Sequence, residues 1–215
     1  AGAAGGGAAA PAAARPLDTA ARLDESQINR IHSAVRWNKP RNEVAAIIKQ
    51  VGADLPAAVG SSDLKTGNRC LHIAAQNGHE DLVKWLIEEK ADVNAQNFKG
   101  QTALHMTVEY DFYFISVLLL DAGADRQLKN EDGHPAIKGI DGGKADADAW
   151  DNPVTILKAV PEDDASKLEM AFKKLEEADP SIIDKAALVQ AGMQKRRSCS
   201  ANWNAARFMN IVKNF

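Results

Sequence analysis

An internal repeat with a period of 33 residues constrains this chain more than any other feature of its sequence. Residues 67–72 (GNRCLH) recur as residues 100–105 (GQTALH) and, in weaker form, as residues 133–138 (GHPAIK). The same step relates residues 91–94 (ADVN) to 124–127 (ADRQ) and residues 86–87 (LI) to 119–120 (LL). Several offsets that agree on one period predict a repeat architecture, in which each unit buries its apolar face only by stacking on its neighbours.

The residue types inside the repeat suit stacked pairs of helices. Gly67, Gly100 and Gly133 recur where a tight turn requires a positive φ, which glycine adopts without a Cβ clash. Thr102 suits the start of a helix, because its hydroxyl can accept a hydrogen bond from an unpaired backbone N–H. We therefore expect at least three stacked helix pairs between residues 28 and 160. One buried apolar column should consist of Leu71, Leu104 and Ile137.

These motifs resemble the ankyrin-repeat family. Residues 67–94 follow that family's consensus most closely, including His72, Ala74, Ala75, Gly78, His79 and Val83. The resemblance covers residues 28–160 and implies an all-α fold, an ankyrin-repeat solenoid of helix pairs with hairpin-like fingers between the repeats. We expect about four repeats within residues 23–160, the two central ones strong and the terminal ones degenerate.

The degenerate repeats lie on either side of the strong pair. Residues 31–34, 44–48 and 52–54 indicate a first repeat, with Pro40 at the break between its two helices. In the last repeat, Gly and Asp replace the expected helices over residues 139–151, and residues 154–157 are expected to restore the second helix. Terminal repeats commonly differ in this way, because their outer face meets water or another element.

The two ends of the chain do not follow the repeat. Residues 1–22 are an Ala/Gly-rich N-terminal tail that would bury too little surface to offset the entropy of ordering it. Residues 161–215 are predicted to be a C-terminal helical extension, interrupted at Asp179-Pro180. Its first helix should carry Leu168, Phe172 and Leu175, its second should be capped by Ser181, and its third should carry Phe208, Ile211, Val212 and Phe215. The extension either covers the end of the solenoid or reaches out to a partner.

Composition disfavours several classes of partner and compartment. A net charge of −3 argues against nucleic acid, because phosphate contacts require a surplus of Lys and Arg. No apolar run approaches the roughly 20 residues that span a bilayer, so we expect membrane contact only through a partner. Cys70 and Cys199 lack metal or redox spacing, which favours a reducing intracellular setting rather than secretion. The compartment is expected to be the cytoplasm or, given the Met-less Ala-rich start, a plastid or mitochondrion.

We find no catalytic, cofactor-binding or metal-ligating constellation, and expect neither enzymatic activity nor a bound cofactor or metal. His72 and His105 occupy the structural histidine position of the family that the repeat resembles, where the ring hydrogen-bonds neighbouring backbone. Cys70, His72 and His79 lack a nearby fourth ligand for zinc. One further motif is either a basophilic phosphorylation site or the cationic end of a solvated helix, namely Lys195-Arg196-Arg197-Ser198.

The resemblance implies that a partner protein binds the finger tips and the concave face of the first helix in each repeat. The residues at these positions are Lys65, Asn68, Asn77, Phe98, Lys99, Gln101, Glu109, Tyr110, Glu131 and His134. Phe98 and Tyr110 stand out, because aromatic side chains are favoured interface anchors. A finger tip has no core to pack into, so Phe98 is expected to have no folding role there.

Together, these observations predict a non-catalytic protein–protein interaction module. The small number of repeats and the helical extension favour an accessory or scaffolding subunit within a larger assembly. The alternative is a free cytosolic ankyrin adaptor that recruits a partner protein, and an enzyme with an unrecognised site is a distant third. Repeat surfaces of this kind follow no general code, so the partner is not identified from the sequence.

Overall fold

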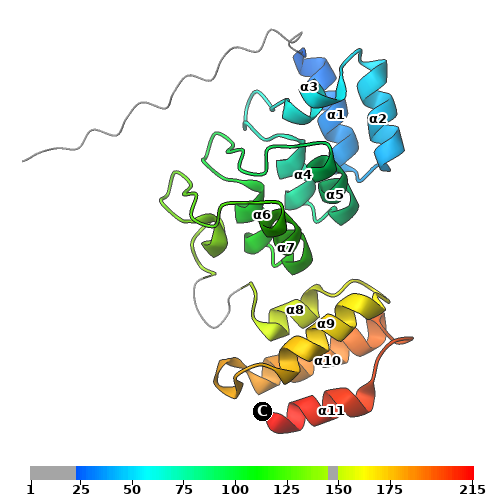
Figure 1. Cartoon of the computed structure of the whole chain (residues 1–215), viewed down its shortest axis with the longest axis vertical. Coiled ribbons are helices and arrows are strands. Elements are labelled where there is room, and N and C mark those ends of the chain that lie inside the picture. The colour runs from blue at the N-terminus through cyan, green and yellow to red at the C-terminus, as the bar shows by residue number, and fades with distance from the viewer. Residues whose placement is uncertain (1–22, 145–149) are drawn as a thin grey trace, which may run out of the picture.

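The computed structural model describes residues 23–144 and 150–215, which form an all-α fold, as predicted (Figure 1). The α-helices are α1 (Glu25–Arg36), α2 (Arg41–Gln50), α3 (Leu55–Gly60), α4 (Cys70–Gln76), α5 (Glu80–Glu88), α6 (Ala103–Glu109), α7 (Tyr113–Asp121), α8 (Pro153–Ala159), α9 (Ala165–Glu176), α10 (Lys185–Ser198) and α11 (Ala205–Asn214). Two short 3-10 helices are η1 (Ala136–Lys138) and η2 (Pro180–Ile182). The predicted tail, residues 1–22, lies outside the described residues.

Three helix pairs stack on one another in the upper part of Figure 1 and confirm the predicted solenoid. They are α1 with α2, α4 with α5, and α6 with α7. The first helices pack in sequence, because α4 contacts both α1 and α6, and the second helices α5 and α7 also meet. The short helix α3 occupies the longer connection between the first two pairs and was not predicted. We call α1–α7 together with η1 the array.

The predicted core column is continuous in two repeats and incomplete in the third. Leu71 and Leu104 are buried in one hydrophobic cluster, whereas Ile137 packs against this cluster but is only partly buried. The reason is that a single 3-10 turn, η1, replaces a first helix between Pro135 and Gly139, whose φ is 81°. After the following loop, α8 packs on α7 and restores a second helix, as predicted.

A buried histidine joins each strong repeat to the next. The Nδ1 of His72 accepts a hydrogen bond from the backbone N–H of Arg69 (3.1 Å), and its Nε2 donates to the carbonyl of Gln101 (3.0 Å). His105 makes the same two kinds of bond one repeat later. Burial lowers the pKa of His72 to about 4, which keeps the ring neutral and its Nδ1 free to accept.

Helices α9, α10 and α11 make up the C-terminal extension, and α8 connects them to the array by packing on α7, α9 and α10. Helix α8 therefore contacts both parts of the chain. The predicted domain division at residue 160 stays a prediction. The second predicted helix, α10, begins at Lys185, because Asp184 caps it by accepting hydrogen bonds from the N–H groups of Ala186 and Ala187. The expected cap, Ser181, lies in η2 instead.

The apolar stripe of the last helix faces inward. Its members Phe208, Ile211 and Val212 are buried, and Phe215 is partly buried. The ring of Phe208 lies 6.5 Å from that of Phe172 and 5.0 Å from that of Trp203, centroid to centroid. Gly192 makes room for this cluster, since a Cβ there would overlap the Phe208 ring. The stripe therefore holds the extension together and is not presented to solvent.

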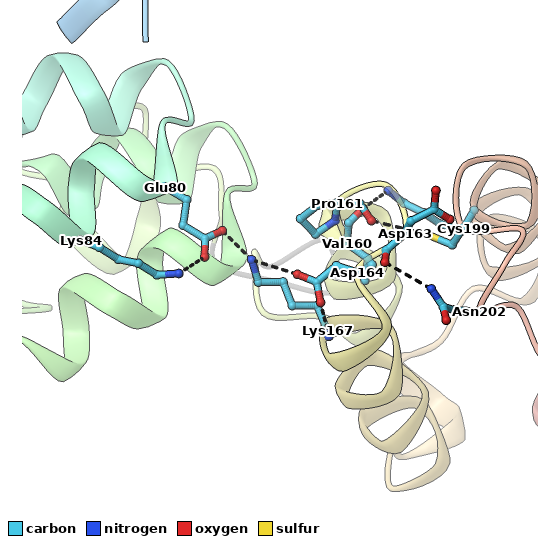
Figure 2. Close-up of polar contacts among 10 residues, drawn as sticks. Glu80, Lys84, Val160, Pro161, Asp163, Asp164, Lys167, Cys199 and Asn202 are labelled. Atoms are coloured by element: carbon cyan, nitrogen blue, oxygen red, sulfur yellow. Dashed lines mark hydrogen bonds and ion pairs between the residues drawn. The ribbon is translucent and has the colours of Figure 1, made fainter. Parts of the chain in front are cut away.

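Polar contacts fix the segment between α8 and α9 to the array (Figure 2). The ammonium of Lys167 lies 2.6 Å from Glu80 Oε2 and 3.5 Å from Asp164 Oδ2. Lys84 also pairs with Glu80, at 2.8 Å. Burial opposes the ionisation of Glu80, but hydrogen bonds from Lys167 and Lys84 outweigh it and lower the pKa of Glu80. Lys167 is in addition 4.9 Å from the ring centroid of Phe114, so one lysine joins α9 to both α5 and α7.

The other side of this segment is held by the end of α10 and the residues that follow it (Figure 2). Cys199 Sγ donates to the carbonyl of Pro161 (3.4 Å), and Asn202 Nδ2 donates to the carbonyl of Asp163 (3.2 Å). Asp163 N in turn donates to the carbonyl of Ser198 (3.2 Å). The basic motif singled out in the sequence, residues 195–198, forms the last turn of α10, where cations are favourable.

Candidate protein-binding surface

The connections between repeats form three fingers, on the left of the array in Figure 1. Finger 1 is residues 63–68, finger 2 is residues 97–101, and finger 3 is residues 130–134. Each is closed by a hydrogen bond from its first N–H to its last carbonyl, namely Asp63 to Asn68 (2.9 Å), Asn97 to Gln101 (2.9 Å) and Asn130 to His134 (3.0 Å). The predicted glycines have φ values of 71°, 68° and 83°, which only a residue without Cβ adopts easily.

The first side chain of each finger organises its turn. Asp63 Oδ1 accepts hydrogen bonds from the N–H groups of Lys65 (3.0 Å) and Thr66 (2.7 Å), and from the Thr66 hydroxyl (2.7 Å). The hydroxyl contact is the main reason that the pKa of Asp63 is lowered. Asn97 and Asn130 accept from the backbone of their own fingers in the same way. The turns are therefore stabilised from within.

Backbone hydrogen bonds also join neighbouring fingers. Phe98 N donates to the carbonyl of Thr66, and Glu131 N donates to the carbonyl of Lys99, each at 3.0 Å. The three fingers thus form one ridge of fixed geometry. A ridge that is already ordered loses little entropy when a partner binds to it.

The ten residues predicted to bind a partner differ in exposure. The exposed ones are Lys65, Asn77, Phe98, Lys99, Tyr110 and Glu131. The half-buried ones are Asn68, Glu109 and His134, and Gln101 is buried. Four of the ten side chains hydrogen-bond within the protein, in the pairs Asn68 with Asn97 (2.8 Å), Gln101 with Asn97 (3.2 Å), Glu109 with Ile140 N (2.8 Å) and Asn77 with the Ile73 carbonyl (2.8 Å). These four support the surface as well as lie on it.

Phe98 is 60% exposed, yet it contacts the protein. A Cβ at Gly67 would lie 2.6 Å from its ring, so the ring covers the backbone of the preceding finger. The expectation that Phe98 has no folding role is therefore wrong in part: one face of its ring packs on finger 1, while more than half of the side chain remains open to a partner.

The helix ends opposite the fingers carry a second row of exposed groups. Tyr110 is the C-cap of α6 and 47% exposed, with its ring 6.1 Å from that of Phe112. Trp37 is the C-cap of α1 and 76% exposed, and the predicted residue Asn77 caps α4 between them. Sequence reasoning missed Trp37, because the first repeat is degenerate and does not follow the 33-residue step.

Leu64, on finger 1, was also missed, although it is 56% exposed. The 33-residue step places it opposite Asn97, which is buried in its own turn. The alignment of the repeats therefore gave no indication that Leu64 is exposed.

Potential metal ligands and thiols lie apart from one another in the described residues. In the described part of the chain, no group of three His, Cys, Asp or Glu side chains is placed to hold a metal ion. Cys70 and Cys199 are both buried and unpaired, and burial raises the pKa of the Cys70 thiol to about 12. None of the described helices is long and apolar enough to cross a membrane.

Comparison with known proteins identifies the repeat. Residues 31–130 match a family model described as ankyrin repeats, in three copies. An ankyrin repeat protein of Rickettsia felis is 28% identical over 137 residues, which is 60% of this chain and 59% of that protein. The NF-kappa-B inhibitor cactus of Drosophila yakuba is 36% identical over 90 residues, 41% of this chain and 18% of that protein. The chain thus spans less than two thirds of the length of these relatives.

Two further matches concern one kind of protein. The B-cell lymphoma 3 protein homolog of Mus musculus is 33% identical over 100 residues, covering 46% of this chain and 21% of that protein. Among solved structures, the ankyrin repeat domain of Bcl-3 is 29% identical and superposes with a TM-score of 0.43, covering 50% of this chain and 44% of that one.

Proposed function

Residues 31–130 are ankyrin repeats, and from this premise we propose that the chain is a non-catalytic protein-binding module whose fingers and helix ends hold a partner protein. Ankyrin repeats imply protein–protein interaction. The observation that supports the proposed surface is the ordered ridge of fingers, whose turns satisfy their own backbone and leave Phe98 open to solvent.

We further propose that the chain acts as an accessory or scaffolding subunit of a larger assembly. The support is the extension, which packs its own apolar stripe inward and so acts as a further layer on the end of the repeats. The alternative is a free adaptor in the cytosol.

A stable, stoichiometric complex in native mass spectrometry favours the subunit, and a monomer that exchanges partners favours the adaptor. Turnover of a substrate by the purified chain would support an enzyme instead.

The intracellular setting is part of the same proposal. Both cysteines are free and buried, which suits a reducing compartment. Nucleic acid is not proposed as a partner, given the net charge of −3.

The test of the binding surface is the double variant Phe98→Ala with Tyr110→Ala. The native complex is isolated from the source cells, its stoichiometric partner is purified, and the affinity of that partner for each variant is measured by calorimetry. Loss of both anchors should weaken binding by about 2 kcal/mol or more. A thermal melt must accompany the titration, because Phe98 also packs on Gly67.

A matched control removes exposed apolar groups elsewhere. Met193 and Met209 are exposed on the extension, and their double change to Ala should leave the affinity unchanged. If this control loses the partner while the Phe98 and Tyr110 variant retains it, the extension is the binding surface and the proposal is wrong.

A further inference from the structure

Finger 1 is one residue longer than fingers 2 and 3, and this affects which side chains stand at its tip. In finger 2 the N–H of Gly100 donates to the carbonyl of Asn97, three residues earlier (3.0 Å), and finger 3 closes in the same way. In finger 1 the N–H of Gly67 reaches the carbonyl of Asp63, four residues earlier (2.8 Å). Asp63 therefore opens finger 1 as Asn97 opens finger 2, and the tip of finger 1 carries one more residue between this opening residue and the glycine.

The longer tip of finger 1 ends in Thr66, and all polar groups of this residue are used. Its hydroxyl donates to Asp63 and accepts from Asn68 N (3.2 Å). Its carbonyl accepts from Phe98 N. The residue is thus built into the turn and the ridge, so the greater length of finger 1 is a feature of the folded structure.

A pattern at the finger tips appears when the residues are counted from Asp63, Asn97 and Asn130, which open the three turns. The first tip residue is then Leu64, Phe98 or Glu131, and the second is Lys65, Lys99 or Asp132. Fingers 1 and 2 therefore present the same pair, a large apolar side chain followed by a lysine. Finger 3 presents two carboxylates instead.

These six side chains are free for a partner. All six are exposed, and none of them forms a side-chain hydrogen bond or ion pair within the described residues. Two other charged residues, Asp63 and Lys129, lie within two positions of these six in the sequence. The carboxylate of Asp63 accepts three hydrogen bonds inside its own turn, and Lys129 precedes finger 3 at its base, in the bridge with Pro135. Neither is a tip position, so the ridge runs from cationic and apolar to acidic.

We propose that the ridge binds one extended segment of a partner protein that carries two apolar residues three positions apart, each beside a carboxylate, and then a basic residue opposite finger 3. This rests on the proposed function of the fingers. Packed helices lie about 8–10 Å apart, and an extended chain advances about 3.3 Å per residue, so successive fingers match every third residue. Leu64 and Phe98 take the apolar residues, Lys65 and Lys99 pair with the carboxylates, and Glu131 and Asp132 pair with the basic end.

The test uses a synthetic peptide with the pattern Leu-Asp-Ser-Leu-Asp-Ser-Arg-Arg. A second peptide has the reversed sequence, because the proposal does not fix the direction in which the bound segment runs along the ridge. A third peptide is charge-inverted, with Lys for Asp and Glu for Arg. Binding to the full chain is followed by NMR and by fluorescence anisotropy up to millimolar concentration. One of the two directions should bind about tenfold more tightly than the charge-inverted peptide, and added salt should reduce this preference.

The second part of the test reverses the charge of two lysines on the ridge. The double variant Lys65→Glu with Lys99→Glu should lose the preference for the acidic–apolar peptide. The matched control, Lys158→Glu with Lys213→Glu, changes two exposed lysines away from the fingers and should keep it. Circular dichroism confirms that both variants remain folded.

The outcomes separate this inference from the proposed function. If neither peptide direction binds at millimolar concentration, or if the charge-inverted peptide binds equally well, the proposed partner chemistry is wrong. If the purified partner still depends on Phe98 and Tyr110 in that case, the fingers remain the binding surface with a different ligand. If the partner does not depend on them, the proposed function itself fails.

Discussion

The array and the C-terminal extension are both helical, but they are stabilised in different ways. In the array a contact recurs at each repeat, as the two hydrogen bonds of His72 recur at His105. In the extension the central cluster of Phe172, Trp203 and Phe208 occurs once. A recurring contact can be deduced from its copy, whereas a single cluster becomes apparent only when distant segments are brought together.

The largest effect expected is the loss of a core leucine in either region. Leu104→Ala and Leu168→Ala each remove a fully buried side chain, so each should lower the free energy of unfolding by about 2–5 kcal/mol. Because α8 packs on both regions, we expect one cooperative transition in urea, followed by circular dichroism. Two separate transitions would show that the regions unfold independently. A loss below about 1 kcal/mol for Leu104→Ala would show that this residue is not core.

Acid should destabilise the chain through histidines of the array and not of the extension, because all five histidines lie in the array and fingers. Burial lowers the pKa of His72 to about 4 from an unfolded value of 6.5. The unfolded chain therefore binds a proton that the folded chain does not, and stability is complete above pH 6.5 and falls as the pH approaches 4. His72 alone accounts for about 3 kcal/mol of this loss.

Burial also lowers the pKa of His32 and of His105, which adds to the same slope. The measurement is the urea midpoint at a series of pH values between 7 and 4 for the chain and for His72→Asn, which should lose part of the slope. An unchanged slope would contradict the assignment of the pH dependence to this ring.

A smaller effect is expected where the extension makes room for an aromatic ring. Gly192→Ala should destabilise the chain by about 1–3 kcal/mol despite the better helix propensity of alanine, because the added methyl group overlaps Phe208. Gly60→Ala in α3 is the matched control, since nothing lies within 4 Å of a Cβ there. This control should be neutral or stabilising by up to about 1 kcal/mol. Equal effects at both sites would exclude tight packing around Gly192.

The smallest effect should arise at the contact between the two regions. Lys167→Met removes the half-buried ion pair with Glu80 and the ammonium group above the Phe114 ring, so we expect a loss of about 1 kcal/mol. Lys173→Met is the control, because its pair with Glu177 is exposed and 3.8 Å long. Hydrogen exchange of α9 measures both. If the two variants behave alike, Lys167 does not fix the extension to the array.

The sequence predicted the array better than the extension, for a physical reason. The positions of Leu71, Leu104, His72 and His105 follow from one period, and the structure has each of them buried. The start of α10 was misplaced, because Ser181 and Asp184 are both good caps and only the path of η2 decides between them. Ile137 was expected to be fully buried, but Pro135 and Gly139 limit its helix to a single turn.

The candidate surface could be predicted in outline only. The exposure of Phe98 and Tyr110 follows from their places on a tip and at a helix end. The burial of Gln101 does not, because it depends on hydrogen bonds with Asn97 in the folded finger. Leu64 was missed because a period counted in residues assumes that all fingers are equally long.

The additional residue in finger 1 shows how such a chain could acquire a new specificity. The tip of this finger is one residue longer than the other two, but the closing bond from Asp63 to Asn68 is of the same kind as in the other fingers. A single codon gained or lost in a finger would therefore alter recognition in one step, because fingers of both lengths close with the same kind of hydrogen bond. Natural variation and laboratory selection alike should tolerate changes of length there more readily than substitutions in the buried columns.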